Sequence, residues 1–381
     1  MVTKGLIFSG IIIIAAFLTS FVSPLNNTGN ADFGNSGTTL NIGLLVSEPG
    51  TLNERALAAI QAAQLAVDQA NMRLTKGQLS AKLIVRSCEG PWGAGSKAAV
   101  DLVFDNDVYA ILTSLDGRNA HLAEQVIAKT KVAMLSALAT DPTLTQAFVP
   151  WYFNCVPNDC QQAEALVDEI VSRRRLQDFI VITDNGYDSK SASSNFLKQL
   201  EKVKALKPVQ LEIDNLNPDY DHLFRQISNT GIKNIVLFAQ PGISLKFIRL
   251  SKKGNIALTI FASLSTLGEN NALKDALNIF DNVVVISSGH WFSERGLTFR
   301  NEFQRKYGYQ PGIAAAYAYD GMNILIQSVK KAEITRDKMI NAITEMNYEG
   351  VTGTIQFDNK GNRKGIPGFM TIKGGKLQDI N

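Results

Sequence analysis

The sequence predicts an α/β fold built from two successive halves, each a mainly parallel sheet flanked by helices. Short, continuous apolar runs alternate with stretches in which apolar residues recur every three or four positions. Short connections separate these segments, and the alternation begins again after Pro157. This rhythm is typical of right-handed βαβ units, whose strands are continuous apolar runs because helices cover both faces. A chain of 381 residues is also long enough for about two domains.

The first half begins at Leu40 and alternates strands with helices. Its first helix has a clear amphipathic stripe, formed by Leu57, Ile60, Ala63 and Val67. The strands are expected at 40–46, 83–85, 108–112 and 132–135, and the helices around 57–70, 98–103 and 122–127.

The second half repeats the pattern and is followed by a helical tail region. Its helices are expected at 163–171, 191–203, 220–228 and 244–250, and its strands at 179–183, 209–213, 234–238, 258–261 and 282–286. Three further helices, 297–307, 314–329 and 336–346, precede two short strands, 354–357 and 369–372.

The composition is that of an ordinary globular protein, with 45% hydrophobic and 19% charged residues. The formal net charge of +3 is too small and too dispersed to indicate nucleic-acid binding. The densest basic run, Arg173 to Arg175, is interpreted as the solvated end of a helix, where cations are favoured by the macrodipole. We therefore expect no nucleic-acid partner.

The N-terminal segment has the character of an export signal. An apolar stretch follows Lys4 and runs to Val22, and one positive residue before a short apolar stretch is typical of a secretory signal peptide. Residues 1–23 are predicted to be a cleaved signal, with an uncleaved membrane anchor as the alternative. Residues 24–38 are predicted to be a flexible leader. The protein is expected to be periplasmic or otherwise extracytoplasmic, and membrane-anchored if the signal is uncleaved.

The cysteines are too few for a disulfide scaffold. Cys155 and Cys160 are five positions apart and could form a disulfide in an oxidising compartment, with two free thiols as the alternative. Because no histidine joins them at metal-ligand spacing, no zinc site is expected.

No segment carries a recognised catalytic motif. A nucleophile elbow, a phosphate loop and a dinucleotide fingerprint between strand and helix are all missing from the sequence. The three histidines are scattered along the chain. We therefore expect a protein that is not an enzyme and needs no cofactor, although a catalytic group assembled only by folding stays open.

The most informative segment joins the third strand to the next helix and contains Asp116, Gly117, Arg118 and Asn119. Ligands of open parallel sheets bind outside the carboxyl ends of the strands. A helix N-terminus there offers unpaired N–H groups to an anion, and Arg118 could clamp it. The alternative is that Asp116 or Asn119 caps the helix and Arg118 points to solvent.

The loop after the fourth strand is the second candidate. It spans 136–145 and includes Leu138, Ala139 and Thr140. Its small residues would let a ligand approach the backbone, and Thr140 carries a donor and an acceptor. The alternative is an ordinary capped turn. Trp92, in a Gly-rich loop, is either a stacking lid over the ligand or a loop plug.

In the second half, Tyr187 and Gln240 follow strands and are the better candidates for closing on a ligand. The neighbouring Asn185-Gly186 is explained by turn chemistry alone.

Four stretches of the chain resemble the type I periplasmic solute-binding proteins, the branched-chain amino-acid receptor family of ABC importers. Residues 135–145 resemble the family's Ser-Pro-x-Ala-Thr-x-Pro-x-Leu-Thr loop, and 351–363 resemble its closing Gly-x-Ile-x-Phe-Asp-x-x-Gly-Asn stretch. Residues 47–50 after the opening strand and 316–322 in a late helix also match. The four occur in the family's order and spacing, and the resemblance covers nearly all of 40–379.

The resemblance implies the periplasmic binding protein-like I fold, in which two Rossmann-like lobes are joined by three hinge crossovers. Lobe one would comprise 39–156 plus 289–349, and lobe two 157–288 plus 350–381. A small polar ligand, such as an amino acid or a related carboxylate or amide, would bind in the cleft and favour hinge closure. The transmembrane subunits of an ABC permease would recognise the closed monomer. A ligand-sensing or regulatory module on the same fold is the alternative function.

The resemblance also assigns roles to residues. Thr140 and the Asp116–Asn119 loop occupy positions that hold a ligand carboxylate. Leu138 and Thr140 flank the backbone that receives the ligand's ammonium group, and Tyr187 falls on a lobe-two loop that usually offers a tyrosine.

Two positions depart from the family. Leu264 stands where amino-acid receptors place an acidic residue for the ligand ammonium, and Pro241 stands where many have an aromatic. An α-amino acid would lose its main cation partner here, and a buried unpaired ammonium is costly. Either Asp116 takes over that role or the ligand has no ammonium.

Overall fold

The structure of the protein is a computed structural model. It describes residues 39–47, 54–75, 78–88, 94–146, 149–269, 280, 283–333, 335–374 and 376–380. The predicted signal (1–23), the predicted leader (24–38) and Trp92 lie outside these residues. The region from Thr39 to Asn381 forms one compact unit.

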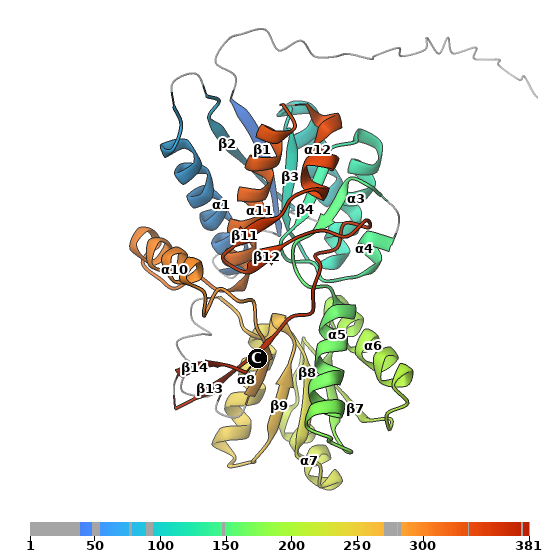
Figure 1. Ribbon diagram of the computed structural model, residues 1–381. Coiled ribbons are helices and arrows are strands. Elements are labelled where there is room, and N and C mark those ends of the chain that lie inside the picture. The colour runs from blue at the N-terminus through green and yellow to red at the C-terminus, as the bar shows by residue number, and fades with distance from the viewer. Residues whose placement is uncertain are drawn as a thin grey trace, which may run out of the picture. The chain divides into compact units, whose positions relative to one another are not determined.

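The first sheet of this unit has five parallel strands in the order β2-β1-β3-β4-β5 (Figure 1). The four strands that the sequence predicted are present, with bounds shifted by up to three residues. The short β5 was not predicted, because three residues are too few for a pattern. The strands are β1 (Leu40–Ser47), β2 (Ala81–Cys88), β3 (Ala110–Ser114), β4 (Ala133–Ser136) and β5 (Tyr152–Asn154).

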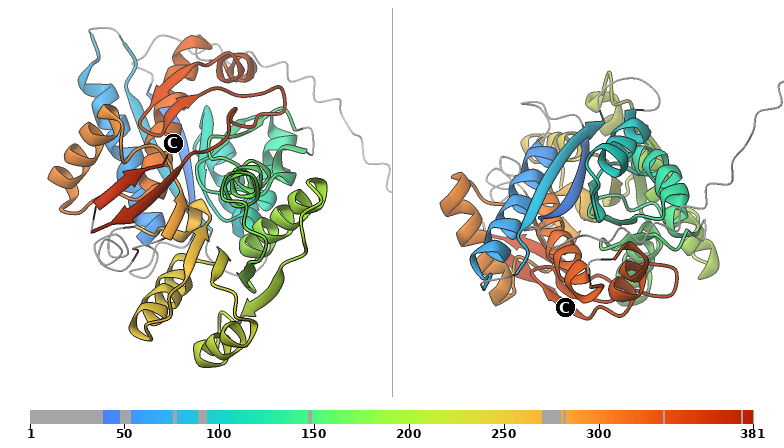
Figure 2. Two further views of the ribbon diagram at one scale, coloured as in Figure 1. Left: turned by 60° about the horizontal axis from the view of Figure 1, so that its bottom comes forward. Right: turned by 90° about the horizontal axis from the view of Figure 1, so that it is seen from above.

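Helices from both ends of the unit cover this sheet. The Ala-rich face of α1 packs against α11, and its small side chains allow the two backbones to approach closely. Figures 1 and 2 both show α1 beside the late helix α11. The helices are α1 (Glu54–Met72), α2 (Ala94–Val100), α3 (Gly117–Thr130), α4 (Thr143–Gln146), α10 (Glu294–Tyr307), α11 (Ile313–Lys331) and α12 (Arg336–Thr344).

The second sheet has seven strands in the order β14-β13-β10-β9-β8-β6-β7. Five are parallel, whereas β13 pairs antiparallel with β10 and β14 pairs antiparallel with β13. The edge hairpin formed by the last two strands was only half predicted, since 376–379 is mostly polar. The strands are β6 (Ile180–Asp184), β7 (Val209–Ile213), β8 (Asn234–Phe238), β9 (Thr259–Ala262), β10 (Val283–Ile286), β13 (Phe369–Lys373) and β14 (Lys376–Asp379).

Among the described residues, four helices flank the second sheet. α5 packs on α6, and α5 continues into a wider turn at Asp168–Arg173. The basic run that begins at Arg173 ends this turn and is exposed, as predicted. The helices are α5 (Asp159–Val167), α6 (Tyr187–Lys202), α7 (Tyr220–Thr230) and α8 (Pro241–Lys253).

The chain passes between the two sheets after β5, after β10 and before β13, and these passages are bonded to one another. The Asn154 N–H donates to the Gly361 carbonyl at 2.8 Å, and the Arg363 N–H donates to the Asn154 carbonyl at 2.9 Å. The Ser287 N–H donates to the Gly368 carbonyl at 2.9 Å. Each sheet together with its helices is called a lobe, and the lobe boundaries expected from the sequence stay a prediction.

A small hairpin, β11 (Tyr348–Gly350) and β12 (Gly353–Ile355), is tied to the first lobe. Buried Asp320 on α11 accepts hydrogen bonds from the backbone N–H groups of Val351 and Thr352, both at 2.8 Å. It also accepts one from the Thr352 hydroxyl at 2.6 Å. This carboxylate therefore fixes where the chain leaves α12 for the second sheet.

Candidate functional site

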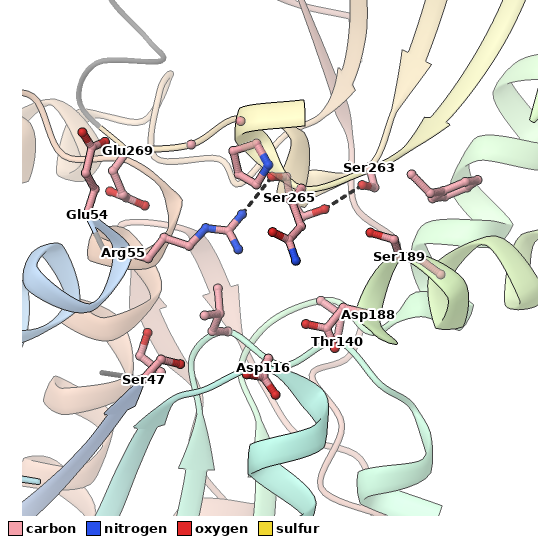
Figure 3. A pocket seen from close by; sticks show the side chains of 18 of the residues that line it. Ser47, Glu54, Arg55, Asp116, Thr140, Asp188, Ser189, Ser263, Ser265 and Glu269 are labelled. Atoms are coloured by element: carbon pink, nitrogen blue, oxygen red, sulfur yellow. Dashed lines mark hydrogen bonds between the residues drawn. The ribbon is translucent and has the colours of Figure 1, made fainter. Parts of the chain in front are cut away.

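A cavity of about 880 Å³ lies between the two sheets (Figure 3). Its walls come from segments that follow strands β1, β3, β4 and β5 of one sheet and β6, β8 and β9 of the other. This is the carboxyl edge of the parallel strands, where the fold is expected to bind ligands. The volume suits a small organic molecule.

Both lobes contribute to the described lining. The first lobe supplies Ser47, Glu54, Arg55, Ala56, Ser114, Asp116, Leu138 and Thr140. Helix α5, which follows β5, adds Asp159 and Gln162. The second lobe supplies Asp188, Ser189, Ala192, Phe238, Gln240, Pro241, Gly242, Leu245, Ser263, Ser265, Gly268 and Glu269.

Asp116 lines the cavity and is the N-cap of α3. Its carboxylate accepts the Asn119 N–H and the Asn119 side-chain amide, both at 2.8 Å. Capping was the alternative interpretation of this loop, and it is the one that the structure shows. The Asn119 side chain is therefore bonded to the capping residue and does not line the cavity. Arg118 is exposed and does not line the cavity either.

Gly117 brings the two lobes into contact. Its N–H donates to Oδ1 of Asp188, which comes from the start of α6, at 2.9 Å. A Cβ at Gly117 would lie 2.8 Å from that oxygen and 3.1 Å from Cε1 of Tyr187. Only glycine allows the second lobe to approach so closely here.

The Asp188 carboxyl has a raised pKa. Burial raises its pKa to about 6, while the hydrogen bond from Gly117 opposes the rise. Negative neighbours, Asp116 and Asp141, raise it further. A cation that enters the cavity would therefore stabilise the ionised form of this carboxyl group.

Tyr187 is not among the residues that line the cavity, and it makes a second contact between the lobes. Its hydroxyl donates to Oδ2 of Asp141 at 2.7 Å, and the tyrosine is 49% exposed. Asp141 also accepts the Thr143 N–H at 2.8 Å and contacts His121 Nε2 at 3.1 Å.

His121 is sandwiched between two carboxylates. Hydrogen bonds with Asp141 and Glu124 raise its pKa to about 9. Burial acts to raise the pKa of Asp141, but the hydrogen bonds from His121, Thr143 and Tyr187 hold it below its usual range. The imidazolium thus fixes the acceptor that Tyr187 reaches from the other lobe.

The loop after β4 presents alternate residues to the cavity. Leu138 and Thr140 line it, whereas Ala139 is buried and its carbonyl accepts the Asn154 amide at 3.0 Å. The Thr140 carbonyl accepts the Asp159 N–H at 2.8 Å, which places the start of α5 at the cavity wall.

In the second lobe, buried Asp184 organises two loops. It accepts the Gly186 N–H at 2.8 Å and the Gln240 N–H at 2.7 Å. Gln240 and Pro241, at the start of α8, consequently line the cavity. Proline is suited to the first turn of a helix, which explains the departure at 241 structurally.

Leu264 does not line the cavity. It is 2% exposed, and its N–H donates to Gln162 Oε1 of α5 at 3.0 Å. Its neighbours Ser263 and Ser265 face the cavity instead, because 264–266 form a 3₁₀ turn.

Charged side chains that no sequence motif marked complete the site. Arg55 on α1 donates to the Ser265 carbonyl of the second lobe at 2.9 Å, as Figure 3 shows. Burial lowers its pKa, and the nearby Glu269 and Asp188 oppose this. Glu269 accepts the Gly312 and Ala314 N–H groups of α11, both at 2.7 Å, and burial raises its pKa to about 7.

Asp159 was also missed. Burial raises its pKa to about 7, while the Thr140 and Ser191 hydroxyls oppose the rise. The Ser191 hydroxyl donates to Oδ2 at 2.7 Å. The sequence signal was present, since Asn158 caps α5 with Gln161 in a capping box, but that signal marks a helix start and not a cavity.

The disulfide between Cys155 and Cys160 is not formed, so the free-thiol alternative holds. Cys155 is buried in the first lobe, where its thiol donates to the Ser136 carbonyl at 3.0 Å. Cys160 is exposed on α5 and its thiol donates to Asn195. The two side chains lie in different lobes, and a spacing of five residues in the sequence does not show this.

Within the described ranges, no group of three or more His, Cys, Asp or Glu side chains is placed to hold a metal ion. None of the helices that the structure describes is both long and apolar enough to span a membrane.

Comparisons with known proteins give the family. A profile of the periplasmic binding protein family matches residues 39–371. Among solved structures, the branched-chain amino-acid substrate-binding protein LivJ of Streptococcus pneumoniae, in complex with isoleucine, has a TM-score of 0.79 at 20% identity. That match covers 90% of this chain and 98% of LivJ.

Two further relatives are a bacterial and a plant protein. A solute-binding protein of Rhodopseudomonas palustris in complex with benzoate has a TM-score of 0.79 at 16% identity, covering 90% of this chain and 96% of that one. Glutamate receptor 2.2 of Arabidopsis thaliana is 22% identical over 90% of this chain, which spans only 39% of the receptor's length.

These structures confirm the predicted two-lobed α/β fold, and the family profile confirms the resemblance to the periplasmic solute-binding proteins. Proteins of this family and these structural relatives bind ligands and are not enzymes. This chain belongs to the periplasmic binding protein family.

Proposed function

We propose that the protein is an extracytoplasmic solute-binding component of an ABC import system. It captures a small polar ligand, of the size of an amino acid or a related carboxylate or amide, in the cavity between its lobes. The observation that carries this proposal is the cavity itself, which is lined from both lobes at the carboxyl edges of their sheets.

The contacts between the lobes support a hinge mechanism. The bonds from Gly117 to Asp188, from Tyr187 to Asp141 and from Arg55 to the Ser265 carbonyl would all break if the lobes moved apart. A ligand that contacts both walls binds the closed arrangement more tightly than the open one and therefore favours closure. The transmembrane subunits of a permease would then recognise the closed monomer.

The test is a thermal-shift screen against amino acids, keto acids, aromatic carboxylates, amides, ureas, polyamines and sugars. A ligand at about a hundred times its dissociation constant adds about 2.7 kcal/mol to the stability of the folded state. We expect at least one class to raise the melting temperature, with one ligand per chain and no turnover. A panel in which no compound shifts the melting temperature contradicts the transport function.

A ligand-sensing role on the same fold is the second candidate. The observation that favours it is the similarity to plant glutamate receptors, which are longer proteins. The N-terminus of the secreted product and the presence of permease genes beside this one distinguish the two roles. A cleaved signal with adjacent permease genes supports transport, and a retained anchor without them supports sensing.

A further inference from the structure

The N-terminus of α3, where a ligand carboxylate was expected, is occupied by the protein's own carboxylates. Asp116 caps the helix and takes the Asn119 N–H. Asp188, reaching from the second lobe, takes the Gly117 N–H at 2.9 Å. A ligand carboxylate placed here would meet two carboxyl groups instead of open N–H donors, and like charges at short range repel.

One residue of the cavity wall has a buried acceptor atom without a partner among the described residues. Asp159 lines the cavity and is 2% exposed; its Oδ2 accepts the Ser191 hydroxyl, whereas its Oδ1 has no described partner with the geometry of a hydrogen bond, the nearby Thr140 hydroxyl included. Ser114, 1% exposed, also lines the cavity with an unpartnered hydroxyl among the described residues. Buried polar atoms of native proteins almost always have a partner, because an unsatisfied one is costly. Oδ1 of Asp159 can therefore accept one further hydrogen bond.

The charges on the described lining residues are strongly unbalanced. Apart from exposed Glu54, a single cation, Arg55, stands against four carboxyl groups: Asp116, Asp159, Asp188 and Glu269. Arg55 is engaged with the Ser265 carbonyl and lies in the field of Glu269 and Asp188. One positive charge cannot balance the negative charges of these carboxyl groups. A second cation that enters the cavity would stabilise the ionised forms of the buried carboxyl groups.

On the basis of the proposed binding function, we infer that the ligand is an organic amine that carries an ammonium group and no carboxylate. Its ammonium donates to Oδ1 of Asp159, with the Ser114 hydroxyl beside it. Asp188 acts as a built-in carboxylate: it fills the α3 N-terminus that a ligand carboxylate would otherwise take. It also adds negative charge next to the cation.

Calorimetric titration with matched pairs tests this inference. Each pair is an amino acid and its decarboxylated amine: lysine with cadaverine, phenylalanine with phenethylamine, and leucine with isoamylamine. We expect at least one amine to bind, with its parent amino acid at least about tenfold weaker.

The outcomes separate this inference from the proposed function. If amino acids bind as tightly as their amines or more tightly, the inference is wrong and the binding function stands. The same holds if only carboxylates, amides or sugars bind. If no compound of the full screen binds, both fail.

Three variants locate the site. Asp159→Asn should weaken binding of the preferred amine by roughly 30-fold or more, because a buried ammonium loses its charged partner. Asp188→Ala should weaken it as well and should strengthen binding of the parent amino acid, since the Gly117 N–H becomes open to a carboxylate. Asp221→Asn, which removes an exposed carboxylate on α7, is the matched control and should change neither affinity.

Melting temperatures show whether each variant is folded. If Asp159→Asn is not folded, Ser114→Ala replaces it and should cost a few-fold in amine affinity. Unchanged amine affinity in folded Asp159→Asn, or unchanged preference in folded Asp188→Ala, overturns the assignment.

Discussion

Gly117→Ala tests the closure of the lobes at a residue that does not itself line the cavity. The new methyl group would lie 2.8 Å from Asp188 Oδ1 and 3.1 Å from Tyr187, both in the second lobe. In the first lobe its nearest contact is the Asp141 Cβ at 3.2 Å, and alanine suits the first residue of a helix. The clash is therefore felt mainly when the lobes are closed.

Overpacking of this kind costs about 1–3 kcal/mol. Because the penalty falls on the closed state, it should weaken ligand binding by about 5- to 150-fold. The assay is calorimetric titration with the compound of the screen that binds most tightly, together with a melting curve of the free protein. The melting temperature should change little.

Gly242→Ala is the matched control. Gly242 also lines the cavity, but a Cβ there would meet no atom within 4 Å. Equal dissociation constants for Gly117→Ala and Gly242→Ala would refute the reasoning that the Gly117 contact limits closure.

Three further substitutions and one titration have outcomes that the structure predicts. Tyr187→Phe removes the hydroxyl that reaches Asp141 and should weaken ligand binding by about 1 kcal/mol, measured by titration, since this bond is half-exposed; an unchanged affinity would show that the bond does not contribute to closure. Asp320→Ala leaves two buried N–H groups unpaired and should lower the free energy of unfolding by about 2–4 kcal/mol in urea titrations, whereas a loss below about 0.5 kcal/mol would contradict its anchoring role. The pKa of His121 is raised to about 9, so its contribution to the free energy of unfolding is complete below pH about 6.5 and is lost as pH rises through 9. The free energy of unfolding of His121→Gln, measured in urea across this pH range, should lack that decline. The same pH dependence in the variant and the parent protein would contradict this. Thiol titration of the denatured protein should give three free thiols per chain, and a value of one would show a bridge.

The sequence predicted the strands and helices of this fold well wherever they are long and apolar. The β6 strand was expected at 179–183 and lies at Ile180–Asp184, because an uninterrupted apolar run bounded by turn residues has few alternatives. The three-residue β5 and the polar β14 were missed, since their pairing depends on neighbouring strands and not on their own composition.

The candidate site was predicted in part. Asp116, Leu138, Thr140 and Gln240 line the cavity because they directly follow strands. Leu264 was misplaced by one residue, since a 3₁₀ turn rotates its side chain into the core.

The charged lining residues were missed for a different reason. Asp159 and Asp188 stand in the first turn of helices, where acidic residues are common and stabilising without any ligand. Arg55 was missed although the helix dipole does not favour a cation in the first turn of α1. These residues are far apart in the sequence, and only the packing of the two lobes brings their side chains to one cavity.

Reversible binding of one small ligand between the lobes is tested most directly with Ala192→Trp. Ala192 on α6 lines the cavity, and an indole there fills part of its volume. Calorimetric titration of the parent protein should give one ligand per chain, recovered unchanged. The variant should be folded and should bind at least about tenfold more weakly. Equal affinity in the folded variant would contradict binding between the lobes, because the ligand would then bind elsewhere.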